Sequence, residues 1–328
     1  KSEIKKIKHH LYGIVSVKKY FSAGDWLKEV KKKINECIKK RKTPIVVGGT
    51  GLYFNTITKG ISKQLLPIYD KPMIYYPICT LMQAGIREIL VIIDKFNFEA
   101  FKNLLGDGSQ WGVEIQFKIQ EKPDGLAQSF IIGSDFIKND PTCLILGDNL
   151  FYGFENNDKL KRAMTKREGG TIFAHQVSDP ERYGVVEFNE RNEVISIQEK
   201  PLKPLSKFAV TGLYFYDNNV VEIAKQIKPS KRGELEITTI NQIYLSENLL
   251  NVELMNQGMA WLDTGTFDSL YEASAFIHTL EKRQGINVGC PEEIAFRMGW
   301  INYDKLLKLA ESHSKNEYGA YLQKLIKE

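Results

Sequence analysis

The stretch Pro44–Pro67, PIVVGGTGLYFNTITKGISKQLLP, decides the fold of this 328-residue chain. Its first residues after the proline, Ile45–Val47, form an uninterrupted β-branched run, which is typical of a strand buried on both faces. Three glycines follow this run: Gly48, Gly49 and Gly51. Glycine permits a turn whose backbone N–H groups point at phosphate oxygens, although any sharp bend favours glycine too. Lys63 and Gln64 add a cation and an amide downstream, so we expect this stretch to bind nucleotide phosphates.

Further motifs match one enzyme family in order and spacing. They are ITKGISKQLLPIYDKPMIYYP, PDGLAQSF, LGDNLFYG, DPERYGVVEF, EKP, AVTGLYFYDNNVVEIA, RGELEITTIN and WLDTGT. From about residue 56 to Glu328 the chain resembles a bacterial glucose-1-phosphate thymidylyltransferase. The resemblance implies an α/β fold, with a Rossmann-like nucleotidyltransferase sheet flanked by helices and a smaller sugar-binding and C-terminal helical part. It also implies nucleotidyl transfer from dTTP to α-D-glucose 1-phosphate, giving dTDP-glucose and pyrophosphate in dTDP-rhamnose and cell-surface polysaccharide synthesis.

The resemblance assigns site residues one by one. Besides the three glycines, its nucleotide-binding positions are Lys63, Gln64, Gln120, Pro123, Gly125 and Asp148. Gln120 and Gly125 stand where the family recognises thymine, and an amide offers both the donor and the acceptor that a pyrimidine requires. Without the resemblance, the PDG sequence at 123–125 indicates only a turn.

The sugar-phosphate positions come from the same resemblance. They are Asn149, Tyr183, Gly184, Glu199, Lys200 and Val210, with Thr211 beside the last. A carboxylate such as Glu199 can accept sugar hydroxyls, and Lys200 can balance a phosphate dianion. The implied catalytic residues are Lys63 and Lys200, which align and neutralise the two phosphates. General acid–base residues are not required, because the nucleophile is already an anion.

Two aspartates are candidates for a metal site. Asp148 follows the apolar run 142–146, and an acid at the carboxyl end of a parallel strand lies where open α/β sheets bind ligands. An Asx turn explains an isolated Gly-Asp-Asn equally well. Asp263 follows a second strand-like run, and two carboxylates together with phosphate oxygens suit Mg²⁺. By resemblance Asp148 and Asp263 are its ligands, so we expect their carboxylates to converge.

The glycine turn departs from the family at one position. Where the family places an arginine that binds the nucleotide phosphates, this chain has Tyr53.

Residues 1 to about 55 resemble a different family. They are similar to an internal piece of a tRNA dimethylallyltransferase, through HHLYGIVSVKKYFSAGDWLKEV and PIVVGGTGLYFN. The P-loop of that second family is absent, which argues against prenyl transfer to tRNA. Two alternatives stay open: a catalytically dead nucleotide or sugar-nucleotide binder, and a related enzyme that uses UTP.

Charge and composition agree with a large enzyme of the cytoplasm. Residues 1–42 hold 14 Lys+Arg and 4 Asp+Glu, whereas the remainder holds 31 and 36. The basic character therefore belongs to the N-terminal segment, whose lysines we interpret as a solvated face rather than a nucleic-acid site. The four cysteines have no paired spacing, which indicates reduced thiols. No run is long and apolar enough for a membrane span, and we expect a homo-oligomer, a homotetramer by resemblance.

The chain order predicts the elements. We expect an N-terminal appendage over residues 1–43, with an amphipathic helix at 24–40, and the nucleotidyltransferase domain over 44–328. Predicted helices cover 72–84 and 99–105, and the chain after Pro291 should be helical. Predicted strands cover 88–93, 113–119 and 142–146.

Overall fold

We describe the protein from a computed structural model, which describes residues 62–153, 158–191 and 193–327, together with Lys32, Ile34, Glu36 and Lys39. The chain divides into two compact units, residues 1–63 and residues 64–328. The four described residues near the N-terminus are helical, as expected within 24–40. The predicted strand at 45–47, the glycine turn and Tyr53 lie outside the described residues, and so does the resemblance of residues 1–55 to a second family.

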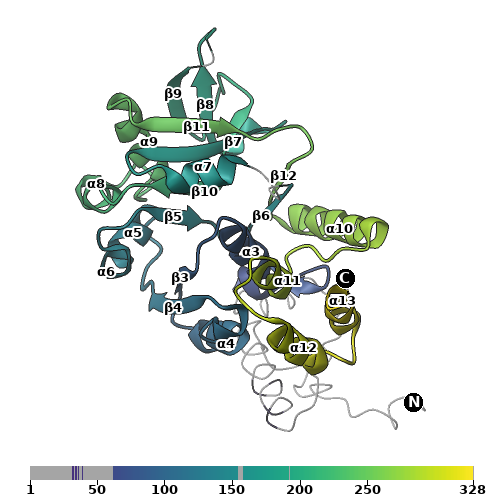
Figure 1. Ribbon diagram of the computed structural model, residues 1–328. Helices are drawn as coiled ribbons and strands as arrows, with labels where there is room; N and C mark the ends of the chain where they lie inside the picture. The colour runs from purple at the N-terminus through teal and green to yellow at the C-terminus, as the bar shows by residue number, and fades with distance from the viewer. Residues whose placement is uncertain are drawn as a thin grey trace, which may run out of the picture. The chain divides into compact units, whose positions relative to one another are not determined.

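The second unit alternates strands and helices (Figure 1). Its strands are β1 (Pro67–Ile68), β2 (Lys71–Pro72), β3 (Glu88–Ile93), β4 (Glu114–Ile119), β5 (Thr142–Ile145), β6 (Asn149–Tyr152), β7 (Gly170–Gln176), β8 (Gly184–Phe188), β9 (Val194–Glu199), β10 (Phe208–Tyr216), β11 (Leu250–Leu254) and β12 (Ala260–Asp263). Its α-helices are α3 (Tyr75–Gln83), α4 (Phe98–Leu105), α5 (Gln128–Ile132), α6 (Ser134–Ile137), α7 (Asp158–Thr165), α8 (Val220–Gln226), α9 (Ile237–Ser246), α10 (Phe267–Gln284), α11 (Pro291–Arg297), α12 (Tyr303–Ser312) and α13 (Glu317–Leu325). Short 3₁₀ turns are η2 (Lys63–Leu65), η3 (Ser109–Trp111) and η4 (Pro180–Arg182).

The largest sheet is mixed and is built around β10. Its order is β11-β7-β10-β8-β9, with β5 also paired to β10. β11 runs parallel to β7, and the other pairings are antiparallel. β10 is buried along almost its whole length, since eight of its nine residues are buried, and this continuous apolar pattern marks a central strand. Helices α5, α8 and α9 pack on this sheet through one apolar cluster.

A second layer surrounds the parallel pair β3 and β4. Apolar residues from these strands pack with α3, α4 and the three C-terminal helices in one cluster. Helix α11 lies beside α3 in Figure 1, and α12 and α13 pack on α11 and on each other. They confirm the helical tail expected after Pro291, and two of them begin at asparagines, Asn302 and Asn316, whose side chains accept a backbone N–H of the first turn. The α/β class is therefore confirmed.

Two of the predicted elements need correction. Helix α3 begins at Tyr75 rather than at residue 72, because Lys71 and Pro72 pair with Ile68 and Pro67 as a short antiparallel ladder. The strand before Asp148 was expected to be parallel, but among the described strands β5 pairs only with β10, and the pair is antiparallel. Asp148 nevertheless lies just beyond the end of this strand, immediately before β6. The strand β3 and the helix α4 lie within one residue of their predicted bounds.

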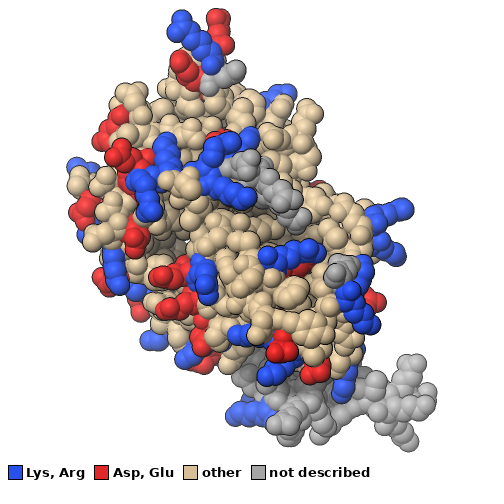
Figure 2. All heavy atoms as spheres, viewed as in Figure 1, with Lys and Arg blue, Asp and Glu red and all other residues tan. Residues whose placement is uncertain are grey.

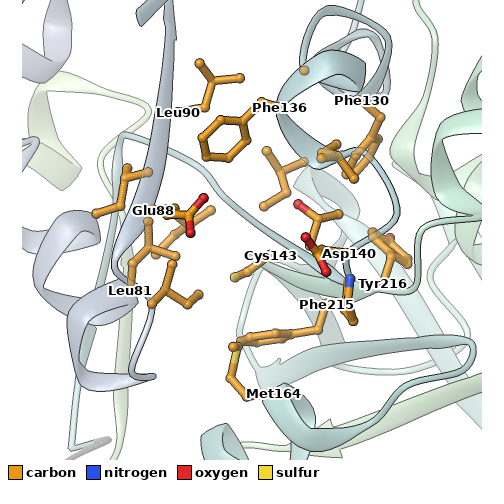
Figure 3. A pocket seen from close by; sticks show the side chains of 18 of the residues that line it. Leu81, Glu88, Leu90, Phe130, Phe136, Asp140, Cys143, Met164, Phe215 and Tyr216 are labelled. Atoms are coloured by element: carbon orange, nitrogen blue, oxygen red, sulfur yellow. The ribbon is translucent and has the colours of Figure 1, made fainter. Parts of the chain in front are cut away.

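A cavity of about 470 Å³, lined by both apolar and polar residues, lies between β3 and β5. Figure 3 shows Leu90 and Phe136 on one side of it and Met164 and Phe215 on another, with Cys143 from β5 facing in. None of the predicted site residues lines this cavity. Burial raises the pKa of the Cys143 thiol, and Cys79, Cys143 and Cys290 are all free thiols, as predicted for the described cysteines.

The surface of the described residues carries both signs of charge. On the face seen in Figure 2, Lys and Arg side chains alternate with Asp and Glu side chains. This face therefore lacks the continuous basic stripe of a nucleic-acid-binding surface. Among the described residues, the structure contains no helix with the length and apolarity needed to cross a membrane.

Candidate active site

Asp148 and Asp263 converge on one buried amide. The Nδ2 atom of Asn149 lies 3.0 Å from Oδ1 of Asp148 and 3.4 Å from Oδ1 of Asp263. The two carboxylate oxygens are therefore at most about 6.4 Å apart. The antiparallel pair β6–β12 explains this convergence, because its register places Asp263 directly opposite Asn149. The convergence that we predicted from a separation of more than a hundred residues is confirmed.

The chemistry of this acid pair fits a hard divalent cation. Mg²⁺ is usually held by one or two carboxylates together with substrate phosphates and waters, rather than by a complete protein cage. Among the described residues no group of three or more His, Cys, Asp or Glu side chains gathers as a metal site, so the protein would supply two carboxylates only. Arg182 Nη2 lies 3.7 Å from Oδ2 of Asp263 and already partly balances its charge.

The predicted sugar-phosphate residues form a second group beside the acids. Gly184 on β8 lies directly opposite Glu199 on β9. A Cβ atom built on Gly184 would lie 3.6 Å from Oε2 of Glu199 and 3.6 Å from Cγ2 of Val210. The backbone N–H of Lys200 donates to the carbonyl of Tyr183 at 3.0 Å. The structure thus brings together five predicted residues from three adjacent strands and the residues that flank them: Tyr183, Gly184, Glu199, Lys200 and Val210.

Two aromatic rings join this group to the acid pair. Tyr183 and Trp261 meet edge to face, with their ring centroids 5.0 Å apart. Trp261 then donates its Nε1–H to Oδ1 of Asn149 at 2.6 Å. Burial, and after it the charge of Asp263, raises the pKa of Tyr183, which therefore keeps its hydroxyl proton. A chain of side-chain contacts through Tyr183, Trp261 and Asn149 consequently links the sugar group to the acids.

Asn149, a predicted sugar-phosphate residue, is buried next to the acid pair. Its side chain is only 1% exposed, and both ends of its amide are already hydrogen-bonded within the protein. In this position the side-chain amide of Asn149 donates to the carboxylates of Asp148 and Asp263. Direct contact between Asn149 and the sugar phosphate stays a prediction. In this arrangement, the amide already has its hydrogen-bond partners within the protein.

The predicted base-recognition loop is held by backbone contacts to the segment around Leu235. Asp124 accepts from the N–H of Leu235 at 2.7 Å, and Ala127 donates to its carbonyl at 3.1 Å. Gly125 has a φ of +111°, and a Cβ there would lie 2.5 Å from the backbone of Leu235, so only glycine fits. Pro123 and Gly125 therefore lie in one fixed loop.

Gln120 is tied to the same loop. Its Nε2 donates to Oε1 of Gln128 at 2.6 Å, and Gln128 in turn donates to Oδ2 of Asp124 at 3.2 Å. Three residues after Leu235, Thr238 donates to Oε2 of Glu199 at 2.5 Å. The segment 232–238 thus connects the base loop to the sugar group.

Gln64 lies against the loop that carries the first acid. Its Cγ is 3.0 Å from the Cβ position of Gly147, the residue before Asp148. Lys63 precedes it in the short turn η2. The glycines that we predict to bind phosphate, Gly48, Gly49 and Gly51, lie outside the described residues.

Sequence reasoning missed several residues of this surface. Trp261 and Thr238 contact predicted site residues, as described above, and Arg232 Nη1 lies 3.6 Å from Oε1 of Glu199. Arg182 lies between the acid pair and Tyr183, and its hydrogen bond to Asp179 raises the pKa of its guanidinium. The only available signal was sequence adjacency, since Arg182 precedes Tyr183 and Trp261 stands two residues before Asp263.

Comparisons with known proteins agree with this geometry. The profile of the nucleotidyl transferase family matches residues 42–279. A glucose-1-phosphate thymidylyltransferase from Neisseria meningitidis is 55% identical over 283 residues, covering 86% of this chain and 98% of the relative. A protein of the same name from Xanthomonas campestris is 54% identical over 288 residues, covering 88% and 98%.

Solved structures give the same result. A Bacillus anthracis protein, assigned to the same activity and crystallised with sucrose, aligns with a TM-score of 0.65 at 38% identity, covering 75% of this chain and 96% of its own. A UDP-glucose pyrophosphorylase complexed with UDP-glucose aligns with a TM-score of 0.60 at 24% identity over 71% of this chain and 96% of its own, which supports the fold alone. The chain belongs to the glucose-1-phosphate thymidylyltransferase family of nucleotidyl transferases.

Proposed function

We propose that this protein transfers a thymidylyl group from dTTP to α-D-glucose 1-phosphate, giving dTDP-glucose and pyrophosphate. The observation that carries the proposal is the junction of Asp148 and Asp263 with the sugar group through the Tyr183–Trp261 contact. An acid pair beside a carboxylate–lysine pair suits a reaction between two phosphates. The relatives named above carry this activity in their names.

The protein's part in the reaction is alignment and charge neutralisation. A phosphate oxygen of glucose 1-phosphate attacks the α-phosphorus of dTTP, and pyrophosphate leaves. Glu199 would accept hydroxyls of the sugar, Lys200 and Lys63 would neutralise the phosphates, and Gln120 and Gly125 would recognise the base. Asp148 and Asp263 would hold Mg²⁺, which neutralises phosphate charge when it is bound.

The glycine turn would complete the phosphate site. Gly48, Gly49 and Gly51 would offer backbone N–H groups to the triphosphate, as their sequence suggests. Tyr53 in place of the usual arginine would then leave substrate binding weak and impair turnover severely. We propose further that residues 1–55 derive from a tRNA dimethylallyltransferase-like segment, that residues 1–43 form an appendage outside the enzyme domain, and that the protein acts in the cytoplasm as a homotetramer.

The test is pyrophosphate release by the purified full chain, supplied with Mg²⁺, dTTP and glucose 1-phosphate. We expect release with this pair, and dTDP-glucose as the product. The matched control is Asp148→Asn, which keeps the shape of the side chain and removes its charge, and turnover should fall by about 10²–10³-fold. Equal turnover with UTP would favour the UTP-using alternative. Binding of dTTP without any pyrophosphate release would favour the inactive binder.

A further inference from the structure

A chain of hydrogen bonds runs behind the glutamine that is expected to recognise the base. Gln128, the first residue of α5, accepts through Oε1 from Nε2 of Gln120 at 2.6 Å. The same Oε1 accepts at 3.2 Å from the backbone N–H of Asp124, which also donates to the carbonyl of Lys122 at 3.0 Å. Nε2 of Gln128 donates to Oδ2 of Asp124 at 3.2 Å. Gln128 therefore connects Gln120 to both the backbone and the carboxylate of Asp124.

The chemistry of Asp124 fixes the direction of these hydrogen bonds. A backbone N–H can only donate and an ionised carboxylate can only accept, so Gln128 must turn its oxygen toward the first and its nitrogen toward the second. Gln120 must then present Nε2 to Gln128, because its own oxygen in that place would face a second acceptor at 2.6 Å. The orientation of both amides is therefore fixed by two groups that cannot exchange their roles.

The backbone on both sides of these amides is also held. The carbonyl of Asp124 accepts from the N–H of Leu235 at 2.7 Å, and the N–H of Ala127 donates to the carbonyl of Leu235 at 3.1 Å. The backbone N–H of Gln120 donates to the carbonyl of Ile93 at the end of β3, at 2.8 Å. The amide of Gln120 thus has a fixed place as well as a fixed direction.

Gln120 keeps one amide hydrogen and one oxygen for a ligand. One of the two hydrogens on Nε2 is used by Gln128, and Oε1 has no hydrogen-bond partner among the residues that the structure describes. A donor beside an acceptor matches the imide edge of thymine, which offers a carbonyl oxygen and an N–H. Cytosine carries an amino donor where thymine has its carbonyl. To bind cytosine in the same way, Gln120 would have to turn its amide over and lose its hydrogen bond to Gln128.

We propose that Gln128 is a positioning residue for base selection, and that by holding the amide of Gln120 in one orientation it makes the site prefer the imide edge of thymine or uracil over the reversed edge of cytosine. Gln128 acts through Gln120 and does not touch the nucleotide. This inference rests on the proposed function, because it assumes that Gln120 contacts the base.

The test compares base selectivity in the purified full chain and in Gln128→Leu. Calorimetry with dTTP, dUTP and dCTP would give three dissociation constants for each protein. Leucine leaves the amide of Gln120 free to turn over, so we expect the preference for dTTP over dCTP to fall by about 3–10-fold, the effect of one neutral hydrogen bond. The ratio of dTTP to dUTP affinity should stay unchanged, because these two bases share the imide edge.

The matched control is Gln116→Leu on β4. The exposed amide of Gln116 donates to Oε1 of Glu114 at 2.7 Å, and its loss should change neither ratio. Gln128→Ala replaces the leucine variant if that protein does not fold, since alanine is the best helix former.

The double variant Asp124→Asn with Gln128→Glu should rescue selectivity. A carboxylate at position 128 still accepts from Gln120 and from the backbone N–H, and an amide at position 124 donates to it in place of the original bond. The orientation of Gln120 is then kept, so the preference for dTTP over dCTP should stay near that of the unaltered chain.

Two kinds of result would overturn the inference. An unchanged ratio of dTTP to dCTP affinity in folded Gln128→Leu, or a loss of this ratio in the double variant as large as in Gln128→Leu, would overturn the positioning role alone. Equal affinities for dTTP and dCTP in the unaltered chain, or no binding of dTTP at all, would instead remove the base recognition of the proposed function and this inference with it.

Discussion

Gly184 lies directly across the β8–β9 ladder from Glu199. A Cβ at this position would lie 3.3 Å from Oγ1 of Thr238 and 3.6 Å from Oε2 of Glu199. A methyl group at this position would therefore press on the hydroxyl of Thr238 and contact the carboxylate that is expected to accept sugar hydroxyls. Its backbone is not in the left-handed region, so the requirement comes from space and not from strain.

Gly184→Ala should therefore weaken sugar-phosphate binding. A misplaced methyl group in a binding pocket costs about 1–3 kcal/mol, or roughly 10–200-fold. We expect the KM for glucose 1-phosphate to rise by such a factor, while the KM for dTTP changes little. Steady-state kinetics with each substrate varied in turn would measure both. Ile195→Ala on β9, where the side chain is 52% exposed, serves as the control in the same hairpin. Equal effects on both substrates would contradict the assignment.

A buried lysine in β2 connects the β1–β2 ladder to helix α10 and the residues after it. Lys71 is 3% exposed, and its Nζ lies 2.6 Å from Oδ1 of Asp70, 2.9 Å from Oε1 of Glu281 and 2.8 Å from Oδ1 of Asn287. Burial raises the pKa of Glu281, and Lys71 opposes this shift. Removing the lysine leaves a buried carboxylate without its counter-charge, which is costly.

Lys71→Met should lower the free energy of unfolding by about 3–5 kcal/mol. Urea denaturation followed by circular dichroism would measure the change. The control is Lys225→Met on α8, which removes an exposed pair with Glu222 at 2.7 Å and should cost no more than about 1 kcal/mol. A change as small for Lys71 as for Lys225 would mean that the buried pair does not contribute to stability.

His175 on β7 should make stability depend on pH. Burial lowers the pKa of His175, and its Nδ1 has no hydrogen-bond partner in the described part of the chain. As the pH falls, the unfolded chain is protonated first, near pH 6.5, and the folded protein only at lower pH. The contribution of the neutral histidine to stability is therefore complete above about pH 6.5. It is lost as the pH falls toward the folded pKa.

We expect His175→Leu to reduce the fall in unfolding free energy between pH 7 and pH 5. One proton contributes a slope of at most about 1.4 kcal/mol per pH unit. Denaturation curves at half-unit steps of pH would give the two profiles. Between pH 7 and 8 the profiles should run parallel, which is the internal control. Parallel profiles below pH 6.5 as well would exclude His175 as a source of the acid sensitivity.

The sequence predicted several elements of the fold, among them the strand before Asp148 and the strand-like run before Asp263. The strand Glu88–Ile93 was predicted correctly, because a short continuous apolar run bounded by turn residues is typical of a buried strand. The convergence of Asp148 and Asp263 was also predicted, from resemblance together with the oxygen chemistry of a cation site. The partners of Asn149 were not predictable, because its contacts to Gly212 and Trp261 depend on the register shift of β10 and on the β6–β12 pairing. Neither feature has a local sequence signal.

The N-terminal segment should be dispensable for nucleotide binding. The family profile begins at residue 42, and every recognised site residue lies downstream of it. Deleting Lys1–Arg41 should therefore leave the affinity for dTTP nearly unchanged, as measured by calorimetry on the shortened and the full chain. A large loss of affinity in a shortened protein that keeps its circular dichroism spectrum would mean that the segment contributes to the nucleotide site.

Turnover should depend most on Tyr53. The corresponding arginine in the resembled family brings a fixed, permanently charged fork to the triphosphate, whereas tyrosine brings a neutral hydroxyl on a rigid ring. Loss of one such preorganised group costs about 3 kcal/mol, or roughly 10²–10³-fold in rate. Lys63 does not reproduce the geometry of the fork, and Leu52, Phe54 and Thr56 also replace polar or proline positions of the family turn. We therefore expect weak binding of both substrates and severely reduced turnover.

The decisive variant is Tyr53→Arg, with Leu52→Thr added in the same background if the turn needs it. Pyrophosphate release should rise by about 10²–10³-fold, because the restored fork stabilises charge on the reacting phosphates. Tyr53→Lys is the matched control, since it restores the charge without the planar fork and should recover only part of the rate. Tyr53→Phe should leave the low rate unchanged. Full family-like turnover in the unaltered chain, or no gain from arginine, would place the limiting step elsewhere than in this turn.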